Sequence, residues 1–246
     1  MQNKETINCD IEEGVCSPSK TAATNVLSVT NTNNSSKVKL LYYYDALCGW
    51  CYGFSPVVQK IKETYQDEIE IEVISGGLFL GHRAGAVNEV APHIKAGAFR
   101  SVEGRTGVKF GQPFLEDVFG EGKMILNSLS PTIALCIIKE KLPEQQVTFA
   151  GMLLSAVYSD GVDPTDINAL ADYAVKIGFD KQGFLTKMKD PKFETAAEKE
   201  FERFRQSPYS GMPALVAEKD GQQYPLSRGY ADFEELNCRL KAVLAN

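Results

Sequence analysis

The sequence contains no apolar run long enough to cross a membrane and no excess of basic residues. Its longest apolar runs, such as MLLSAV and TIALCII, are far shorter than the roughly 20 residues that span a bilayer. Lysine and arginine total 26 against 32 aspartates and glutamates, so the formal net charge is −6. Such a charge gives no long-range attraction to phosphate backbones. We therefore expect neither a membrane nor a nucleic acid as a partner.

Cysteine and histidine are also scarce. The six cysteines stand at positions 9, 16, 48, 51, 136 and 238, and the two histidines at 82 and 93. This number is too small for a disulfide-stapled scaffold, which a chain of 246 residues does not need. The first residues, MQNKETINCDIEEGV, lack the basic and apolar segments of an export signal, so we expect a cytoplasmic location. In a reducing cytosol, a close cysteine pair favours catalysis or metal binding over a structural role.

Such a pair is present in DALCGWCYGFSP, residues 45 to 56. The run VKLLYYYD before it, residues 38 to 45, predicts a strand that is covered on both faces and central in a sheet. Apolar residues at helical spacing after Cys51 predict a helix that continues to about residue 66. EIEIEVIS, residues 68 to 75, alternates apolar and acidic side chains, which predicts a strand near a sheet edge. Together they predict a βαβ unit with parallel strands.

The rest of the chain suggests a tail, a helical block and a final ββα unit. Residues 1 to 37 are polar and rich in Asn, Ser and Thr, which predicts a flexible tail. Residues 82 to 206 have the pattern of loops and helices, one of them beginning with Ser130 as its cap and Pro131 in the first position. Two short strands flanking an Asp-Gly pair at 220 and 221 predict a hairpin before a last amphipathic helix. We expect an α/β fold in which 38–81 and 207–246 form one domain and 82–206 an inserted helical domain.

Cys48 stands where the predicted helix begins. Unpaired backbone N–H groups and the helix dipole favour negative charge there, so this cysteine gains thiolate character. Cys51 follows one turn later on the same face, within bonding range. The two residues predict disulfide exchange in which Cys48 forms a mixed disulfide and Cys51 resolves it. Gly49 lies where such sites tune their redox potential, and Trp50 offers a large apolar face to an approaching chain.

Two other interpretations of the pair are a zinc half-site and two buried thiols that are close by coincidence. Zinc takes four ligands, and no second pair is apparent, because the two histidines are eleven residues apart. Cys9 and Cys16 are seven apart in the predicted tail. A labile second pair that passes electrons to the site is one alternative for them, which the sequence does not favour. Cys136 and Cys238 lie on apolar helix faces and are predicted to be inert core thiols. The sequence favours the redox interpretation, and we expect no metal.

The same run resembles the thioredoxin superfamily. Pro56, five residues after Cys51, has the spacing of that superfamily's helix-kinking proline. Gly229 matches a glycine that usually precedes the last helix. The superfamily opens its third strand with a cis-proline that packs against the active-site disulfide, and the resemblance assigns this role to Pro213 in GMPAL, residues 211 to 215. The backbone of Met212 would then pair with an extended substrate.

The long helical insertion resembles the DsbA-like branch of this superfamily. YYYDALCGWCYGFSP, SGGLFLG, SLSPTIAL and GMPALV are similar to the predicted protein-disulfide isomerases of the DsbA family that lack export signals. The resemblance covers about residues 38 to 245 and implies a thioredoxin-like fold with a large helical insertion between the second and third strands. Relatives often have Gly-Phe-Pro or Gly-Val-Pro at the loop, so Met212 is a departure.

This resemblance implies a thiol:disulfide oxidoreductase or protein-disulfide isomerase without a cofactor. Its partners would be protein or small-molecule disulfides and an unidentified recycling reductant or oxidant. The kappa-class glutathione transferases and related isomerases share the inserted architecture, but they usually have a serine or a single cysteine where this chain has CGWC. A third hypothesis is a non-catalytic binding module that uses the groove beside Pro213.

Three further polar residues have open roles. Asp45, three residues before Cys48, either accepts a proton from Cys51 or forms a cap or turn. His82 and His93 are expected to face solvent or to be satisfied by neighbours, with no chemical role.

Overall fold

The computed structural model of the protein describes residues 6–9, 16–19 and 37–245. Its strands are β1 (Thr6–Cys9), β2 (Cys16–Ser19), β3 (Val38–Tyr44), β4 (Ile69–Ser75), β5 (Gly85–Ala86), β6 (Ile125–Leu126), β7 (Ala214–Lys219) and β8 (Gln222–Arg228). Its α-helices are α1 (Gly49–Thr64), α2 (Val87–Val90), α3 (Phe99–Thr106), α4 (Gln112–Phe119), α5 (Leu129–Lys141), α6 (Gln146–Tyr158), α7 (Ile167–Lys176), α8 (Lys181–Met188), α9 (Pro191–Gln206) and α10 (Phe233–Ala245). Shorter helical turns are η1 (Gly81–Arg83), η2 (Ile94–Ala98) and η3 (Pro143–Gln145).

The predicted flexible tail lies mostly outside the described residues. Its described parts include β1 and β2, which pair antiparallel with each other. In the described part of the chain, no helix has both the length and the hydropathy to cross a bilayer.

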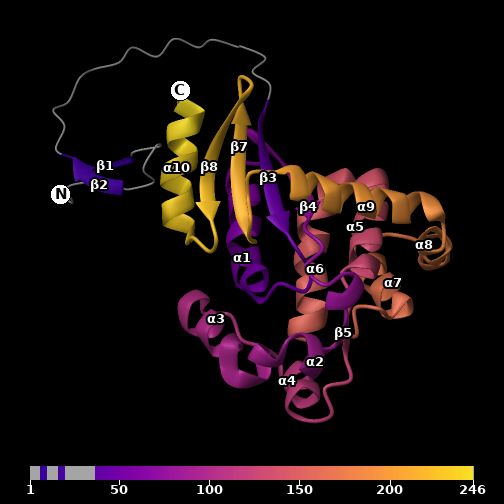
Figure 1. Cartoon of the computed structure of the whole chain (residues 1–246). Helices are drawn as coiled ribbons and strands as arrows, with labels where there is room; N and C mark the ends of the chain where they lie inside the picture. Colours follow the sequence, from indigo (N-terminus) through magenta and orange to yellow (C-terminus); the bar gives the residue numbers. More distant parts are fainter. Residues whose placement is uncertain (1–5, 10–15, 20–36, 246) are drawn as a thin grey trace.

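The main sheet has four strands in the order β4-β3-β7-β8 (Figure 1). β3 is parallel to β4 and antiparallel to β7, which confirms a central β3 and an edge position for β4. The Asp220–Gly221 hairpin is also confirmed, because it joins β7 to the antiparallel β8. Both turn residues have positive φ, 52° and 75°, as a two-residue turn that matches the strand twist requires.

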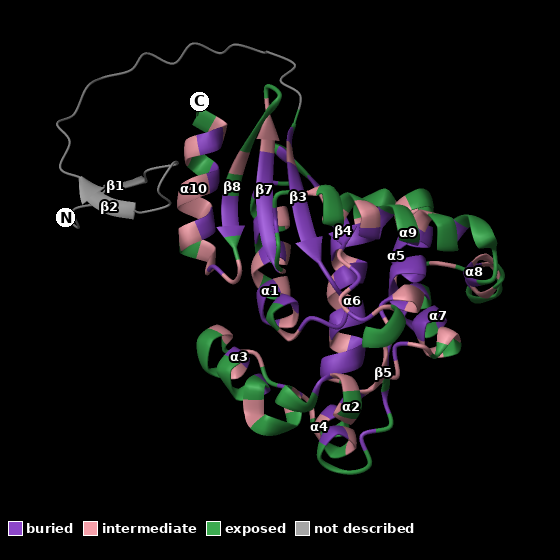
Figure 2. Ribbon diagram, in the orientation of Figure 1, coloured by how far each residue is buried: buried purple, intermediate pink, exposed green. Residues whose placement is uncertain are grey.

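The side chains of β3 alternate between two buried layers, because successive residues of a strand point to opposite faces. Tyr42 and Tyr44 lie in the larger core with residues of α1, α6 and α10. Leu41 and Tyr43 lie in a smaller core on the other face, where Phe204 of α9 packs. Figure 2 shows β3 and β7 almost entirely buried between these layers. β3 is therefore covered on both faces, as its apolar run predicts.

The helices α2 to α9 lie between β4 and β7 in the chain. In Figure 1, α5 to α9 stand beside β4, while α2 to α4 lie beyond the carboxyl end of β3. The block also contains β5 and β6, which pair over two residues each, so the prediction of helices and loops alone is wrong here. The exact domain boundaries stay a prediction.

The start of α5 also differs from the prediction. The N-cap residue is Ser128, and Asn127 Oδ1 accepts a hydrogen bond from the backbone of Leu129 at 2.9 Å. Ser130 lies inside the helix.

The outer edge of β4 is covered by polar side chains of the helical block. Val73 N donates to Gln146 Oε1 of α6 at 2.9 Å, and Ser75 N donates to Glu200 Oε2 of α9 at 3.2 Å. Lys139 Nζ of α5 donates to the Val73 carbonyl and to Glu200 Oε1, both at 2.7 Å. Because an edge strand presents unpaired backbone groups that attract other strands, three helices supply the partners that a fifth strand would supply.

Candidate active site

Cys48 is the N-cap residue of α1, as the sequence predicts. Its backbone is extended, with φ −99° and ψ 108°, and its Sγ accepts a hydrogen bond from Cys51 N at 3.3 Å. The first N–H groups of a helix have no partner within the helix, so the sulfur takes the place of the usual capping oxygen. Both cysteines are free thiols. This geometry presents a backbone donor to Cys48 Sγ at the start of the helix.

Cys51 lies deeper than Cys48. Its side chain is fully buried, whereas Cys48 keeps 7% of its surface exposed. Burial raises the pKa of the Cys51 thiol well above its usual value, and the neighbouring Cys48 raises it further. The pair is therefore asymmetric: Cys48 keeps a small exposed area, and burial disfavours the charged form of Cys51.

The loop before β7 faces this pair. The Met212–Pro213 peptide bond is cis, as predicted. Cys48 Sγ lies 3.7 Å from the Met212 carbonyl oxygen and donates to it. The carbonyl of Pro213 accepts a hydrogen bond from Gly229 N at 2.8 Å. Gly229 has a φ of 91°, a conformation that a side chain disfavours, and this explains a glycine at that position.

Asp45 connects the cysteine loop to the helical block. Its carboxylate is buried and accepts hydrogen bonds from Leu47 N at 2.9 Å, Leu78 N at 2.9 Å and Ser128 Oγ at 3.0 Å. Burial raises the pKa of this carboxyl, and the two backbone N–H groups counteract part of the rise. Both oxygens thus bind the surrounding loops, which supports the turn-forming interpretation of Asp45 over that of a proton acceptor for Cys51.

A cleft of about 880 Å³ opens beside Cys48. Gly49 and Trp50 line it from α1, and Met212 lines it from the loop before β7. The helical block adds aromatic walls, among them Phe99 and Phe110, whose ring centroids are 5.8 Å apart. Trp50 is 39% exposed, so it presents its indole to anything that enters.

The two histidines line the same cleft. His82 and His93 are exposed, as expected, but they stand at its rim together with Arg83, Glu89 and Arg205. Sequence reasoning missed this position, because their spacing in the chain says nothing about a cleft that only the folded helical block creates.

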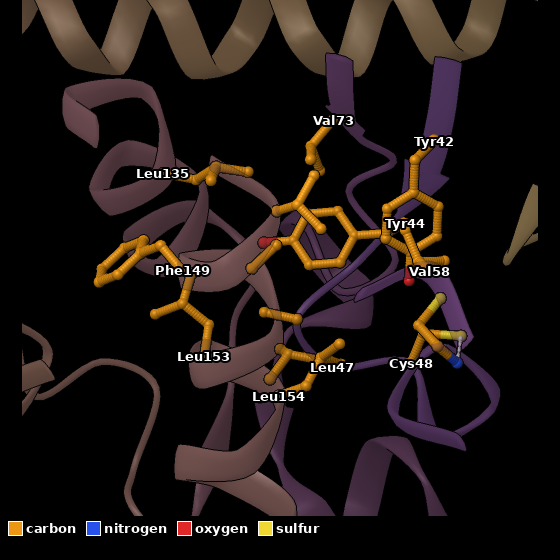
Figure 3. Close-up of a cluster of buried hydrophobic side chains, with 14 of the residues drawn as sticks. Tyr42, Tyr44, Leu47, Cys48, Val58, Val73, Leu135, Phe149, Leu153 and Leu154 are labelled. Atoms are coloured by element: carbon orange, nitrogen blue, oxygen red, sulfur yellow. Dashed lines mark hydrogen bonds between the residues drawn. The ribbon is translucent and has the colours of Figure 1, made fainter. Parts of the chain in front are cut away.

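Sequence reasoning also missed that buried tyrosines lie near the pair. Tyr42 and Tyr44 of β3 and Tyr158 of α6 are at most 2% exposed. Burial raises the pKa of each well above the usual value, and nearby charged forms of the cysteines raise it further. Figure 3 shows the ring of Tyr42 extending from β3 towards Cys48, whereas the ring of Tyr44 extends towards Leu135 and Phe149. Strand alternation in YYYD places Tyr42 and Tyr44 on one face, but it does not show that this face meets the start of α1.

The other cysteines behave differently from one another. Cys136 is a buried free thiol, and burial raises its pKa to about 12, which confirms the predicted core thiol. Cys238 is disulfide-bonded, so its prediction as an inert thiol is wrong. The side chains of Cys9 and Cys16 lie outside the described residues, so the structure does not test the alternative of an electron relay through them. Among the residues that the structure describes, no group of three or more His, Cys, Asp or Glu side chains is arranged to hold a metal.

Comparison with known proteins finds solved structures that are similar to this one. A crystal structure of a candidate protein disulfide isomerase from Nitrosomonas europaea superposes with a TM-score of 0.75 at 25% identity, covering 85% of this chain and 98% of that one. The cytosolic disulfide reductase DsbM from Pseudomonas aeruginosa superposes with a TM-score of 0.68 at 23% identity, covering 84% and 98%. A second structure of DsbM contains glutathione and superposes with a TM-score of 0.65 at 19% identity, covering 85% and 100%.

A curated relative is the ClpXP adapter protein SpxH from Halalkalibacterium halodurans, 24% identical over 184 residues. The match includes 72% of this chain but only 56% of that relative's length. The family model of the DSBA-like thioredoxin domain matches residues 39–241. With this match over most of the chain, and with a four-stranded sheet, a helical insertion and a cis-proline loop facing Cys48, the protein belongs to the DSBA-like thioredoxin domain family.

Proposed function

We propose that the protein is a thiol:disulfide oxidoreductase or protein-disulfide isomerase, with Cys48 as nucleophile and Cys51 as resolving cysteine. The observation that carries the proposal is the capping geometry, in which Cys48 Sγ accepts from Cys51 N at 3.3 Å beside an open cleft. The asymmetry of burial supports the assignment of roles, because Cys48 lines the cleft and Cys51 is fully buried. Family membership supports thiol:disulfide chemistry in general.

The proposed reaction exchanges one disulfide for another. The Cys48 thiolate attacks a substrate sulfur, the substrate S–S bond breaks, and the first substrate thiolate leaves and takes a proton from water. The Cys51 thiolate then attacks Cys48 Sγ, forms the Cys48–Cys51 disulfide and releases the second substrate thiolate. Two electrons pass from the pair to the substrate. An external thiol returns them, or, in the opposite direction, an external disulfide accepts them.

Residues around the pair would bind the substrate and adjust the reaction. Trp50 would provide an apolar contact, and the backbone of Met212 beside Pro213 would pair with an extended segment of the substrate. Gly49 would tune the potential from between the cysteines. Asp45 would act indirectly, because its hydrogen bonds hold the loop that carries Cys48.

The test is reduction of insulin with a supplied thiol as the electron source, comparing wild type with Cys48→Ala and Cys51→Ala. We expect wild type to accelerate the reaction, Cys48→Ala to lose the acceleration, and Cys51→Ala to accumulate mixed disulfides at Cys48. Cys136→Ala is the matched control, since this buried thiol lies on α5 away from the cleft. Wild-type rates in both active-site variants would refute the dithiol mechanism.

Two alternatives predict other outcomes of the same series. A glutathione-dependent transferase or isomerase needs one cysteine at most, so conjugation that survives in Cys51→Ala would favour it. One DsbM structure contains glutathione, which makes glutathione the thiol to test for this alternative. A binding module, as the adapter name of the curated relative suggests, would bind its partner equally well in all three variants while showing no turnover. A cytoplasmic location stays a prediction that fractionation of the source cells would test.

A further inference from the structure

Two hydroxyl groups in the larger core have no hydrogen-bond partner. The hydroxyls of Tyr42 and Tyr44 are buried and unpaired within the described part of the protein. A buried polar group without a partner is costly, and native proteins retain few of them. Because phenylalanine would fill the same space without this cost, the hydroxyls call for an explanation beyond packing.

Tyr42 is the one of the two whose ring extends from β3 towards Cys48 in Figure 3. Its ring packs edge-on against Phe54, with centroids 5.9 Å apart. Phe54 follows Cys51 by three residues, so both face β3 from the same side of α1. After burial, the largest electrostatic influence on Tyr42 comes from Cys51 and the next from Cys48, whereas for Tyr44 it comes from Asp45.

Cys51 needs a donor at one stage of the proposed reaction. It must become a thiolate to resolve the mixed disulfide, and it leaves as a thiolate when its own disulfide is opened. Its burial opposes that charge and keeps its pKa well above the usual value, and the hydrogen bond from the Asp45 backbone offsets only part of the rise. Asp45 cannot serve as a donor when ionised, and its oxygens already accept from Leu47, Leu78 and Ser128.

We propose that the Tyr42 hydroxyl is the hydrogen-bond donor that stabilises the Cys51 thiolate, a role that rests on the proposed dithiol function. The hydroxyl has no partner while Cys51 is a neutral thiol and gains one when Cys51 becomes an anion. Tyr42 keeps its own proton throughout. The Cys51 proton goes to water or to the departing substrate sulfur, the Cys51–Cys48 bond forms, and the Cys48–substrate bond breaks.

The titratable groups that influence Cys51 come from four parts of the chain. Cys48 faces it from its own helix, Tyr42 and Tyr44 from β3, Asp45 from the loop after β3, and Tyr158 from α6. Of these, Tyr42 and Tyr44 are neutral donors whose buried hydroxyls have no partner in the described structure.

The test separates the two chemical steps with the probe dithiodipyridine. Attack by Cys48 releases one thiopyridone, and resolution by Cys51 releases a second, so stopped-flow absorbance follows each step. The trace of the Cys48→Ala, Cys51→Ala double variant is subtracted to remove the absorbance that the other cysteines contribute. In Tyr42→Phe we expect the first phase to change less than about twofold and the second to slow by about tenfold or more, as loss of one hydrogen bond to a charge predicts.

The pH dependence of the second phase should move upward by about one unit in Tyr42→Phe, since the neutral thiol is then favoured. Thermal stability of the reduced protein should stay equal or rise, because the variant removes an unpaired polar group. Tyr44→Phe is the matched control, on the same strand and face with the same unpaired hydroxyl, and should slow the second phase less than about threefold.

The outcomes distinguish this inference from the function on which it rests. If wild type releases no second thiopyridone, the dithiol mechanism fails and the role of Tyr42 fails with it. If wild type shows both phases but Tyr42→Phe resolves at the wild-type rate, only the role of Tyr42 is overturned. Equal slowing in Tyr42→Phe and Tyr44→Phe would overturn it too, because a general change of the core would then explain both.

Discussion

Replacement of Asp45 by alanine tests how firmly the cysteine loop is fixed. The carboxylate is 1% exposed and accepts from two backbone N–H groups and one hydroxyl. The Ser128 hydroxyl can rotate to another acceptor, but the N–H groups of Leu47 and Leu78 cannot. Each unpaired buried donor costs about 1–3 kcal/mol. Relief from burying a charge offsets part of this, so we expect a net loss of about 2–4 kcal/mol.

Urea unfolding followed by circular dichroism measures this loss as a lower midpoint at an unchanged slope. Asp117→Ala is the matched control, because Asp117 also accepts from two backbone N–H groups, at 3.1 Å each, but is only half-buried. Water can replace its carboxylate, so we expect a loss below about 1 kcal/mol there. A loss in Asp45→Ala no larger than in the control would refute the view that Asp45 holds the loop.

The pH dependence gives a second check on Asp45. Burial raises its folded pKa above the ordinary value of 3.8, so the folded chain holds this proton more tightly than the unfolded chain does. Its titration therefore stabilises the fold most at low pH, and the contribution declines as the pH rises from about 4 through the folded pKa. Asp45→Asn does not titrate. The stability of wild type relative to Asp45→Asn should fall over this window. A rise would show that folding lowers the pKa of Asp45 and does not raise it.

Three further predictions concern the surroundings of the site. Burial opposes ionisation of Glu72, but Arg203 and two lysines outweigh it and hold its pKa at about 2; Glu72→Gln should lose about 1–2 kcal/mol in urea unfolding at pH 7, a loss that shrinks as the pH falls from about 4.5 towards 2. A methyl group at Gly53 would lie 2.6 Å from Thr106 Cγ2, so Gly53→Ala should lower the free energy of unfolding by about 1–3 kcal/mol. Adding Thr106→Ala should restore part of this loss, and a double variant that is no more stable than Gly53→Ala would contradict the clash. Cys136, with a pKa of about 12, should resist alkylation at pH 8 until the protein unfolds, which mass spectrometry would detect.

The sequence predicts the strand and helix that carry the cysteines because local patterns determine both. The apolar run ending at Tyr44 indicates a covered strand, and the helical spacing after Cys51 indicates the face of α1 that packs on it. The turn at Asp220 is equally local. Pro213 required the resemblance to a family, since a single proline in the sequence does not reveal the cis form of its peptide bond.

The rest of the site depends on contacts between distant segments. Asp45 and Ser128 are 83 residues apart, and no periodicity connects them. The cap of α5 shows the same limit at short range, because Ser128, Ser130 and Asn127 are all typical capping residues and only tertiary contacts select among them. The cleft is less predictable still, since its walls come from loops and short helices around residues 76 to 110.

The polar side chains along the outer edge of β4 limit how far this chain can be shortened. Gln146, Glu200 and Lys139 occupy the backbone groups there, and all three belong to the inserted block. A truncated chain that joined residue 81 directly to residue 207 would keep both cysteines and the cis-proline loop. It would also expose the unpaired backbone groups of β4, which could pair with the same strand of a second copy. We therefore expect the shortened protein to associate or precipitate even though it keeps both cysteines.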